Sequence, residues 1–388
     1  MQKENAPRVE DYSGRVPEHK AVENLADLPD DVKEASHLAG IEPSEKGRSG
    51  SFFQIDQSVI CARSSQDGVE VMSIEHALNK HSWMKDYYWK AVDADKDEYT
   101  RSLKTGPVKG YFLRTHPGVE TIHPLQSCLF MERDGIAQKV HNIIIAEEGS
   151  HLHIITGCAV HARVRGGIHV GISEFYIKKN ASVTFTMVHN WGEDLHVRPR
   201  SVAHVEEGGT FISNYICMKP VKSLQMYPTT RLLGRGARAS YSSIVLGRND
   251  SVIDIGSRVL LEAPETSAES VARAVARDRS RIFARGHLVG HVPGIKAHLE
   301  CRGLILSPEA VIHAVPELEA RRENLEMSHE AAVGKIAEKE ILYLMSRGLS
   351  EDEATSAIIR GFLKVDIEGL PPKLAAEVRK LTEMEMSI

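Results

Sequence analysis

Turn residues recur in this chain at a nearly constant interval, and that interval is the strongest constraint on its fold. Pairs of turn-forming residues separate short β-branched runs at Gly149-Ser150, Asn180-Ala181, Gly208-Gly209, Gly236-Ala237 and Asp250-Ser251, at intervals of 31, 28, 28 and 14 residues. Gly and Asn accept positive φ angles and can reverse a strand without Cβ strain. A period near 28 with a half-period of 14 predicts a mainly β chain whose coils stack as a β-solenoid. The alternative is an ordinary sandwich with evenly spaced hairpins.

The chain divides into three parts around this repeat. Residues 1–110 combine a polar N-terminal arm with a small mixed and helical region, and residues 111–325 carry the solenoid pattern. Residues 326–388 are predicted to be α-helical. A chain of 388 residues is long enough to bury a large core over several such regions.

The helical prediction for the C-terminal part depends on capping signals. From Met327 onward the apolar residues follow a helical period. Ser350 with Glu353 forms a capping box that opens a helix over Glu351–Phe362. Pro371-Pro372 then begins a last amphipathic helix.

Composition excludes several classes of function. The net charge of −5 gives no basic footprint for nucleic acid, and no apolar run approaches a membrane span. The polar N-terminus lacks the apolar core of a signal peptide, so the cytoplasm is the expected location. There is no G-x-x-x-x-G-K-[ST] motif, so we expect this chain to bind no nucleotide. The five cysteines lie far apart without a C-x-x-C, which argues against a disulfide framework and a zinc ribbon.

The strongest candidate site combines Cys301 with the pair His329-Glu330. Thiolate, imidazole and carboxylate are all side chains that hold iron. Positions 28 or 29 residues apart should lie on neighbouring rungs of the solenoid, about 4.8 Å from each other. The sequence therefore predicts that the Cys301 thiolate shares a metal with either the Glu330 carboxylate or the His329 imidazole. The alternative is that Cys301 is only a small buried apolar residue.

Several longer segments resemble the SufB/SufD family, the scaffold subunits of the SUF-type iron–sulfur cluster assembly machinery. The resemblance covers residue 70 to the end and includes NASVTFTMVHNW at 180–191, MYPTTRLLGRGARA at 226–239, LLEAPETSA at 260–268, CRGLIL from Cys301 and HEAAVGKI from His329. It implies a right-handed parallel β-helix with flanking helical regions. It also implies a transient iron–sulfur cluster on Cys301 and Glu330, and an ABC-type ATPase partner, SufC, that docks on the C-terminal helices. The chain would then be a scaffold rather than an enzyme, with ATP hydrolysis in the partner.

The presence of both Cys301 and Glu330 makes the chain resemble the SufB branch, in the short form of compact archaeal-type systems. It departs from bacterial SufB-like chains at Ala203, which stands where those chains carry a cysteine thought to receive sulfur. Cys217 lies nearby in sequence and is the remaining candidate sulfur acceptor. We expect a second copy, or a SufD-like homologue, to pair across a two-fold through the apolar segment 281–325.

The sequence leaves two other functional hypotheses open. A β-helix enzyme, such as a polysaccharide lyase or a metal hydrolase, would use a carboxylate cluster or the solenoid-face histidines, among them His151 and His153. A structural adaptor would recruit the ATPase while Cys301 stays buried and inert. Anaerobic reconstitution with iron and sulfide separates these readings.

Overall fold

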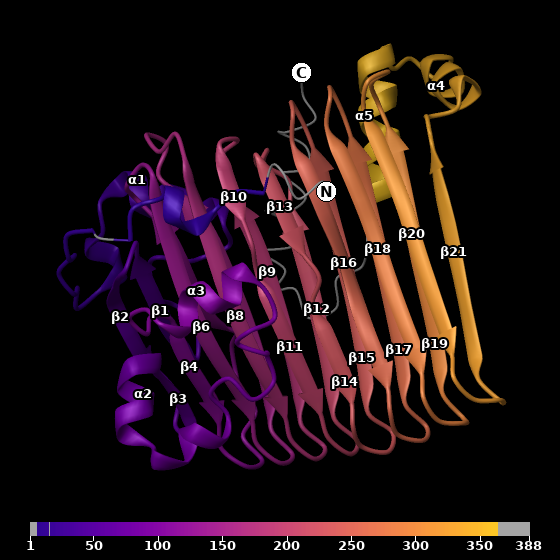
Figure 1. Ribbon diagram of the computed structural model, residues 1–388. Helices are drawn as coiled ribbons and strands as arrows, with labels where there is room; N and C mark the ends of the chain where they lie inside the picture. The colour runs from indigo at the N-terminus through magenta and orange to yellow at the C-terminus, as the bar shows by residue number, and fades with distance from the viewer. Residues whose placement is uncertain (1–5, 15, 364–388) are drawn as a thin grey trace.

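A computed structural model describes residues 6–14 and 16–363, and in it the chain is a β-solenoid of about eight coils (Figure 1). One strand of each coil belongs to a ten-stranded sheet and the other to an eleven-stranded sheet. The first sheet contains β1 (Gly50–Ile55), β2 (Ser58–Ser64), β5 (Leu125–Met131), β7 (His151–Val160), β9 (Ser182–Asn190), β12 (Thr210–Cys217), β15 (Arg238–Gly247), β17 (Ser267–Ala276), β19 (Lys296–Ile305) and β21 (Glu326–Gly334). The second contains β3 (Val69–Ser73), β4 (Tyr111–Thr115), β6 (Ile136–Ala146), β8 (Gly167–Ile177), β10 (Leu195–Val197), β11 (Arg200–Val205), β13 (Ser223–Met226), β14 (Thr229–Leu232), β16 (Val252–Leu261), β18 (Arg281–Gly290) and β20 (Val311–Ala320).

The register of the strands confirms the predicted period. Thr210 lies beside Ser182 and Arg238 beside Thr210, in each case 28 residues along the chain. The turn residues adopt the backbone conformation for which they were singled out, with φ of 67° at Gly149 and 55° at Asn180. All these pairings are parallel, and the antiparallel pairs β1–β2 and β3–β4 lie near the N-terminus.

The core fills the lumen between the two sheets. Aromatic rings pack against one another there, with ring centroids 5.0 Å apart both for the edge-to-face pair Phe175–Phe185 and for the tilted pair Phe175–Phe211. Some side chains that point outward from the sheets meet helices instead. Ile359 and Leu363, for example, pack with Val275 of β17. Lumen packing therefore fills the inner faces of the sheets, and helices cover part of their outer faces.

Short helices lie against the outer faces and the N-terminal end, except α4, which packs beside α5 and buries no residue (Figure 1). They are η2 (Val9–Asp11), η3 (Leu25–Asp27), α1 (Asp30–Leu38), α2 (Ile74–Lys80), η4 (Ser82–Asp86), α3 (Glu98–Lys104), α4 (Glu338–Met345) and α5 (Glu351–Leu363). The predicted capping box of α5 is present, because Ser350 Oγ accepts from the Glu353 N–H at 3.2 Å and Glu353 Oε2 accepts from the Ser350 N–H at 2.7 Å. Across the ranges described, no helix has both the length and the apolarity needed to span a bilayer. The helix expected after Pro371-Pro372 lies outside the described residues.

One predicted boundary is wrong. The helical region was expected to begin at residue 326, but Glu326–Gly334 is strand β21, the last of its sheet (Figure 1). Met, Glu and Ala are good helix formers and suggested a helix. The pairing available along the free edge of β19 outweighs that propensity, as tertiary context commonly does. The first helix after the solenoid begins at Glu338.

The two ends of the solenoid differ. At the N-terminal end the edge strands are β2 and β3, and helices lie beside them (Figure 1). At the other end, β20 pairs with β18 and β21 with β19, and neither has a further neighbour among the described strands. Only β20 within the predicted pairing segment 281–325 is an edge strand, because β18 and β19 are paired on both sides. We call this end, formed by β20 and β21, the open end.

Candidate functional site

Cys301 lies in the lumen one coil from the open end. It sits in β19, belongs to the main core and is 1% exposed. Its neighbours in register are Ala272 on one side and Ala331 on the other, so only small side chains cover it along the solenoid axis. Burial raises the pKa of the Cys301 thiol to about 11, because desolvation disfavours the thiolate. At neutral pH the free thiol is therefore protonated.

The structure does not place His329 or Glu330 directly beside Cys301. The step from β19 to β21 is 30 residues, whereas the sequence argument assumed 28 or 29, so the residue beside Cys301 is Ala331. His329 pairs with Leu299, which is a lumen residue, and Glu330 pairs with Glu300. Because successive residues of a strand point to opposite faces, His329 shares the lumen face with Cys301 and Glu330 does not.

Glu330 belongs to a row of charges on the outer face of the sheet. Arg302 lies between two carboxylates, with Nε 3.0 Å from Glu300 Oε1 and an Nη atom 3.4 Å from Glu330 Oε2. Glu300 also pairs closely with Arg273 of β17. The Glu330 side chain is 62% exposed, so this outer ion pair stabilises the fold little. In this arrangement the Glu330 carboxylate is directed to an arginine and away from the thiol.

Near the open end, Cys301 and His329 together offer two kinds of metal ligand on one face of the sheet. Both face the lumen at the last two rungs, and His329 lies on the last described coil, where it is exposed. A thiol and an imidazole are ligands for iron once the thiol loses its proton to the metal. The ligand atoms of Cys301, His329 and Glu330 are not gathered into one group in the part of the chain described, so a complete iron site needs further ligands or a rearrangement.

Cys217 and Ala203 occupy different places in the lumen. Ala203 on β11 lines a cavity of about 50 Å³ together with Phe175, Phe211 and Tyr241. Cys217 is fully buried at the end of β12, and burial raises the pKa of its thiol to about 12. Cys217 is therefore an un-ionised thiol, although a sulfur acceptor has to react as a thiolate.

Some functional features could not be found from the sequence. Arg302, which holds Glu330, is one residue from Cys301, but nothing in its local pattern marks it as the partner of a residue 28 positions away. The sequence also gives no sign that His19, Asp56 and Glu132 lie together, because they are far apart along the chain. They form the one group of side chains of metal-binding types that the described residues bring together. Only the fold brings such residues together.

Comparison with known proteins gives consistent matches over nearly the whole chain. Residues 129–362 match the family model for the SufBD core domain of SUF-system FeS cluster assembly. The chain is 52% identical to an iron–sulfur cluster assembly SufBD family protein of Methanothermobacter thermautotrophicus (strain Winter) over 373 residues, which is 95% of this chain and 91% of that relative. A SufBD family protein of Archaeoglobus fulgidus is 50% identical, covering 91% of this chain and 94% of the relative. One of Pyrococcus horikoshii is 32% identical, covering 94% and 83%.

Proposed function

Because the chain belongs to the SufBD family of iron–sulfur cluster assembly proteins, we propose that it is a scaffold on which a cluster is built beside Cys301 at the open end of the solenoid. The cluster is the cargo of the reaction and leaves for an acceptor protein. The chain resembles the SufB branch at Cys301 and Glu330, and we propose that it acts as that branch does.

The position of Cys301 carries this proposal. The thiol is buried under a single coil, with Ala331 as its cover and His329 on the same face. A thiol with a raised pKa gives up its proton only when a metal replaces it, so binding of iron and loss of the proton are coupled. One strong thiolate ligand with weaker imidazole or carboxylate ligands suits a site that must later release its cluster.

Glu330 requires a second step in this proposal. It lies on the outer face with Arg302, so it reaches a metal held by Cys301 only if β21 moves relative to β19. Shifting a strand by one residue turns each of its side chains to the other face of the sheet. We propose that a one-residue shift of β21 brings the Glu330 carboxylate into the lumen in place of the His329 imidazole during assembly.

We propose that a SufC-like ABC ATPase docks on the C-terminal helices. α4 has no buried residue and exposes Leu342, Tyr343 and Met345. The neighbouring helix α5 is anchored to the sheet by Ile359 and Leu363. An apolar helix face held next to an anchored helix suits a protein partner, and movement of the ATPase would reach β21 through the short connection to α4.

We further propose that a second copy, or a SufD-like homologue, covers the open end. β20 and β21 are free edges among the described strands, and Val333 on the lumen face of β21 is 40% exposed. Free edge strands with exposed apolar residues are sites of strand pairing. Pairing there across a two-fold would bring two Cys301 residues toward a shared site.

Anaerobic reconstitution with ferrous iron and sulfide tests the proposed site. Cys301→Ala is expected to lose bound iron and sulfide, because the only thiol near the open end is removed. The matched control is Cys158→Ala, which removes another buried lumen thiol from β7 and should leave the iron and sulfide content unchanged. Equal loading of Cys301→Ala and the wild-type protein would contradict the cluster site and support the alternative, in which the chain is a structural adaptor and Cys301 is only a packing residue. Loss of loading in both variants would show that packing, and not ligation, is what matters.

A further inference from the structure

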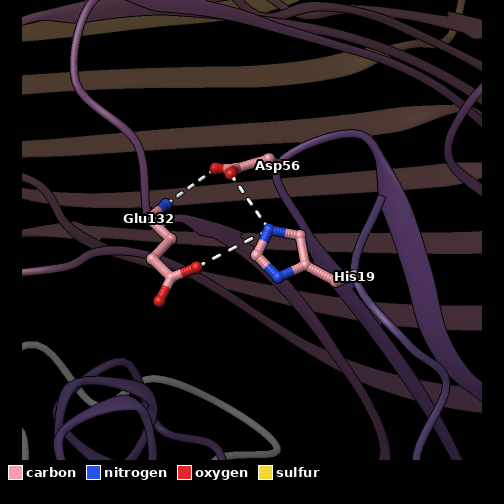
Figure 2. A group of neighbouring side chains, drawn as sticks. All are labelled: His19, Asp56 and Glu132. Carbon is pink, nitrogen blue, oxygen red and sulfur yellow. Dashed lines mark hydrogen bonds and ion pairs between the residues drawn. The ribbon is translucent and has the colours of Figure 1, made fainter. Parts of the chain in front are cut away.

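His19, Asp56 and Glu132, three side chains of types that bind metals in proteins, converge at the N-terminal end of the solenoid (Figure 2). Asp56 directly follows β1 and Glu132 directly follows β5. These two strands are parallel neighbours, so their carboxyl ends bring both carboxylates to the same edge. His19 comes from the polar arm, whose backbone is fixed there by a hydrogen bond from the His19 N–H to Ser58 Oγ at 3.0 Å.

The separations of the three side chains suit a metal ion. His19 Nε2 lies 3.3 Å from Asp56 Oδ2 and 3.6 Å from Glu132 Oε2. Figure 2 marks both contacts, and one ligand atom from each of the three residues lies within 4.8 Å of the other two. First-row ions bind nitrogen and oxygen at about 2.0–2.2 Å, so two ligands at tetrahedral or octahedral angles are about 3.0–3.5 Å apart. Two of the three distances between ligand atoms, 3.3 and 3.6 Å, are already close to that range.

Asp56 is prepared for this role by its surroundings. Its side chain is 0% exposed, while those of His19 and Glu132 are 18% and 21% exposed. Asp56 Oδ1 accepts the Glu132 N–H at 2.7 Å, which leaves Oδ2 directed toward the imidazole. A carboxylate completely removed from water is costly unless it is paired with a cation or a metal.

Two arginines are the competing cations. Arg163 contacts the other Glu132 oxygen, Oε1, at 2.7 Å and leaves Oε2 to the site. Arg133 Nε lies 3.6 Å from Asp56 Oδ2, beyond hydrogen-bond length, and its side chain is 43% exposed. Arg133 can therefore swing into solvent when a metal enters, and until then it balances the charge of Asp56.

We propose that His19, Asp56 and Glu132 bind a divalent first-row transition metal that fastens the N-terminal arm to the solenoid. One imidazole with two carboxylates favours ions of the Mn²⁺, Fe²⁺ and Zn²⁺ class, since Ca²⁺ and Mg²⁺ prefer ligand sets made wholly of oxygen. The site is independent of Cys301, which lies in β19 near the opposite end of the solenoid (Figure 1).

The competing account is an ion-pair network in which the His19 side chain joins the two carboxylates without a metal. Arg133→Gln separates the two. In a metal site Arg133 competes with the ion, so its removal should tighten metal binding several-fold. In an ion-pair network Arg133 contributes charge balance, and its removal should only destabilise the fold.

Metal binding is measured by calorimetry with Zn²⁺ as the probe on the full chain carrying Cys301→Ala, so that the thiol site does not contribute. We expect one equivalent of Zn²⁺ that His19→Ala or Asp56→Asn weakens roughly tenfold or more. Asparagine tolerates the positive φ of 52° at Asp56 and keeps the hydrogen bond from the Glu132 N–H, so that variant should fold. The matched control is His161→Ala, which removes an imidazole paired with the single carboxylate of Asp31 at 2.7 Å and should bind Zn²⁺ as before.

Two further readouts decide the outcome. X-ray absorption of the zinc-loaded chain should show nitrogen and oxygen neighbours at about 2.0–2.2 Å with no sulfur at about 2.3 Å. A chelator should lower the melting temperature of the wild-type chain but not that of His19→Ala, because a ligand stabilises only the state that binds it. Unchanged Zn²⁺ affinity in His19→Ala, or Arg133→Gln that binds no more tightly, would overturn the metal site in favour of the ion-pair network.

Discussion

At the scale of residues, the alternation of side chains along a strand decides which groups can react together. Cys301 and Ala331 face the lumen, whereas Glu330, one residue away, faces Arg302 on the outside. Burial in the same lumen keeps His169 neutral and lowers its pKa to about 3, because no charge compensates an imidazolium there. The lumen thus sets the protonation state of the groups inside it.

Acid should therefore destabilise the fold through His169. The unfolded chain gains a proton there near pH 6.5 and the folded chain near pH 3, so the stabilisation is complete above pH 6.5 and is lost as the pH falls toward 3. At pH 5 this loss is about 2 kcal/mol. His169→Asn, which can still donate to Gln138 Oε1, should show a shallower decline of unfolding free energy in urea titrations between pH 7 and pH 5. His151→Asn, an exposed imidazole on β7, should decline like the wild-type protein, and equal slopes for all three would remove this role from His169.

At the scale of elements, β21 is the strand whose movement the proposed assembly site needs. His298 and Ser328 are in register on β19 and β21, with Nδ1 and Oγ 2.9 Å apart. A disulfide in His298→Cys/Ser328→Cys should fix that register without altering Cys301, His329 or Glu330. We expect slower alkylation of Cys301, measured by peptide mass spectrometry, and less binding of ferrous iron in the absence of sulfide.

The control for this lock is the equivalent pair two coils inward. Ser240→Cys/Glu269→Cys joins β15 to β17, which are in register in the interior of the solenoid. It should leave the Cys301 alkylation rate unchanged. If both crosslinked chains alkylate at the wild-type rate, β21 does not have to move.

The exposed face of α4 gives a second prediction at this scale. Leu342→Glu/Tyr343→Glu should abolish co-purification with the proposed ATPase partner while the melting temperature is kept, because neither side chain is buried. Leu233→Glu, at an exposed apolar residue directly after β14, is the matched substitution and should keep the complex. Retention of the ATPase by the α4 variant would place docking on another surface.

How far the sequence predicts each element depends on whether its signal is local. The solenoid follows from turn residues such as Gly149 and Asn180, since each needs only its own backbone conformation. β21 was missed because Met327 and Glu330 suit a helix, and only the free edge of β19 makes them a strand. The relation of Cys301 to Glu330 needs the length of one coil to within a single residue, and no average period supplies that.

At the scale of the whole molecule, the two unlike ends of the solenoid set how it can associate. At the N-terminal end β2 and β3 are edge strands too, but the N-terminal arm lies along β2, where the Val22 N–H donates to the Ile60 carbonyl at 3.0 Å, so we expect pairing through free edges to use the open end. Val333→Glu, which adds a charge on the lumen face of β21, should convert a dimer to a monomer in multi-angle light scattering. Ile122→Glu, a charge at an exposed apolar residue in the loop before β5, should leave the dimer intact. A chain that is monomeric with a full cluster would show that each copy holds its iron alone.

The stacking of coils also determines where the native state opens first. In a stack each coil contacts only its neighbours, so local unfolding starts at an end and spreads inward by fraying. The coil of β20 and β21 has a neighbour on one side only in the described chain, and its amide protons should exchange with solvent before those of the inner coils. Cys301 lies one rung below that coil, so exposing its thiol needs only that one coil to open, at a fraction of the free energy that protects the rest of the lumen.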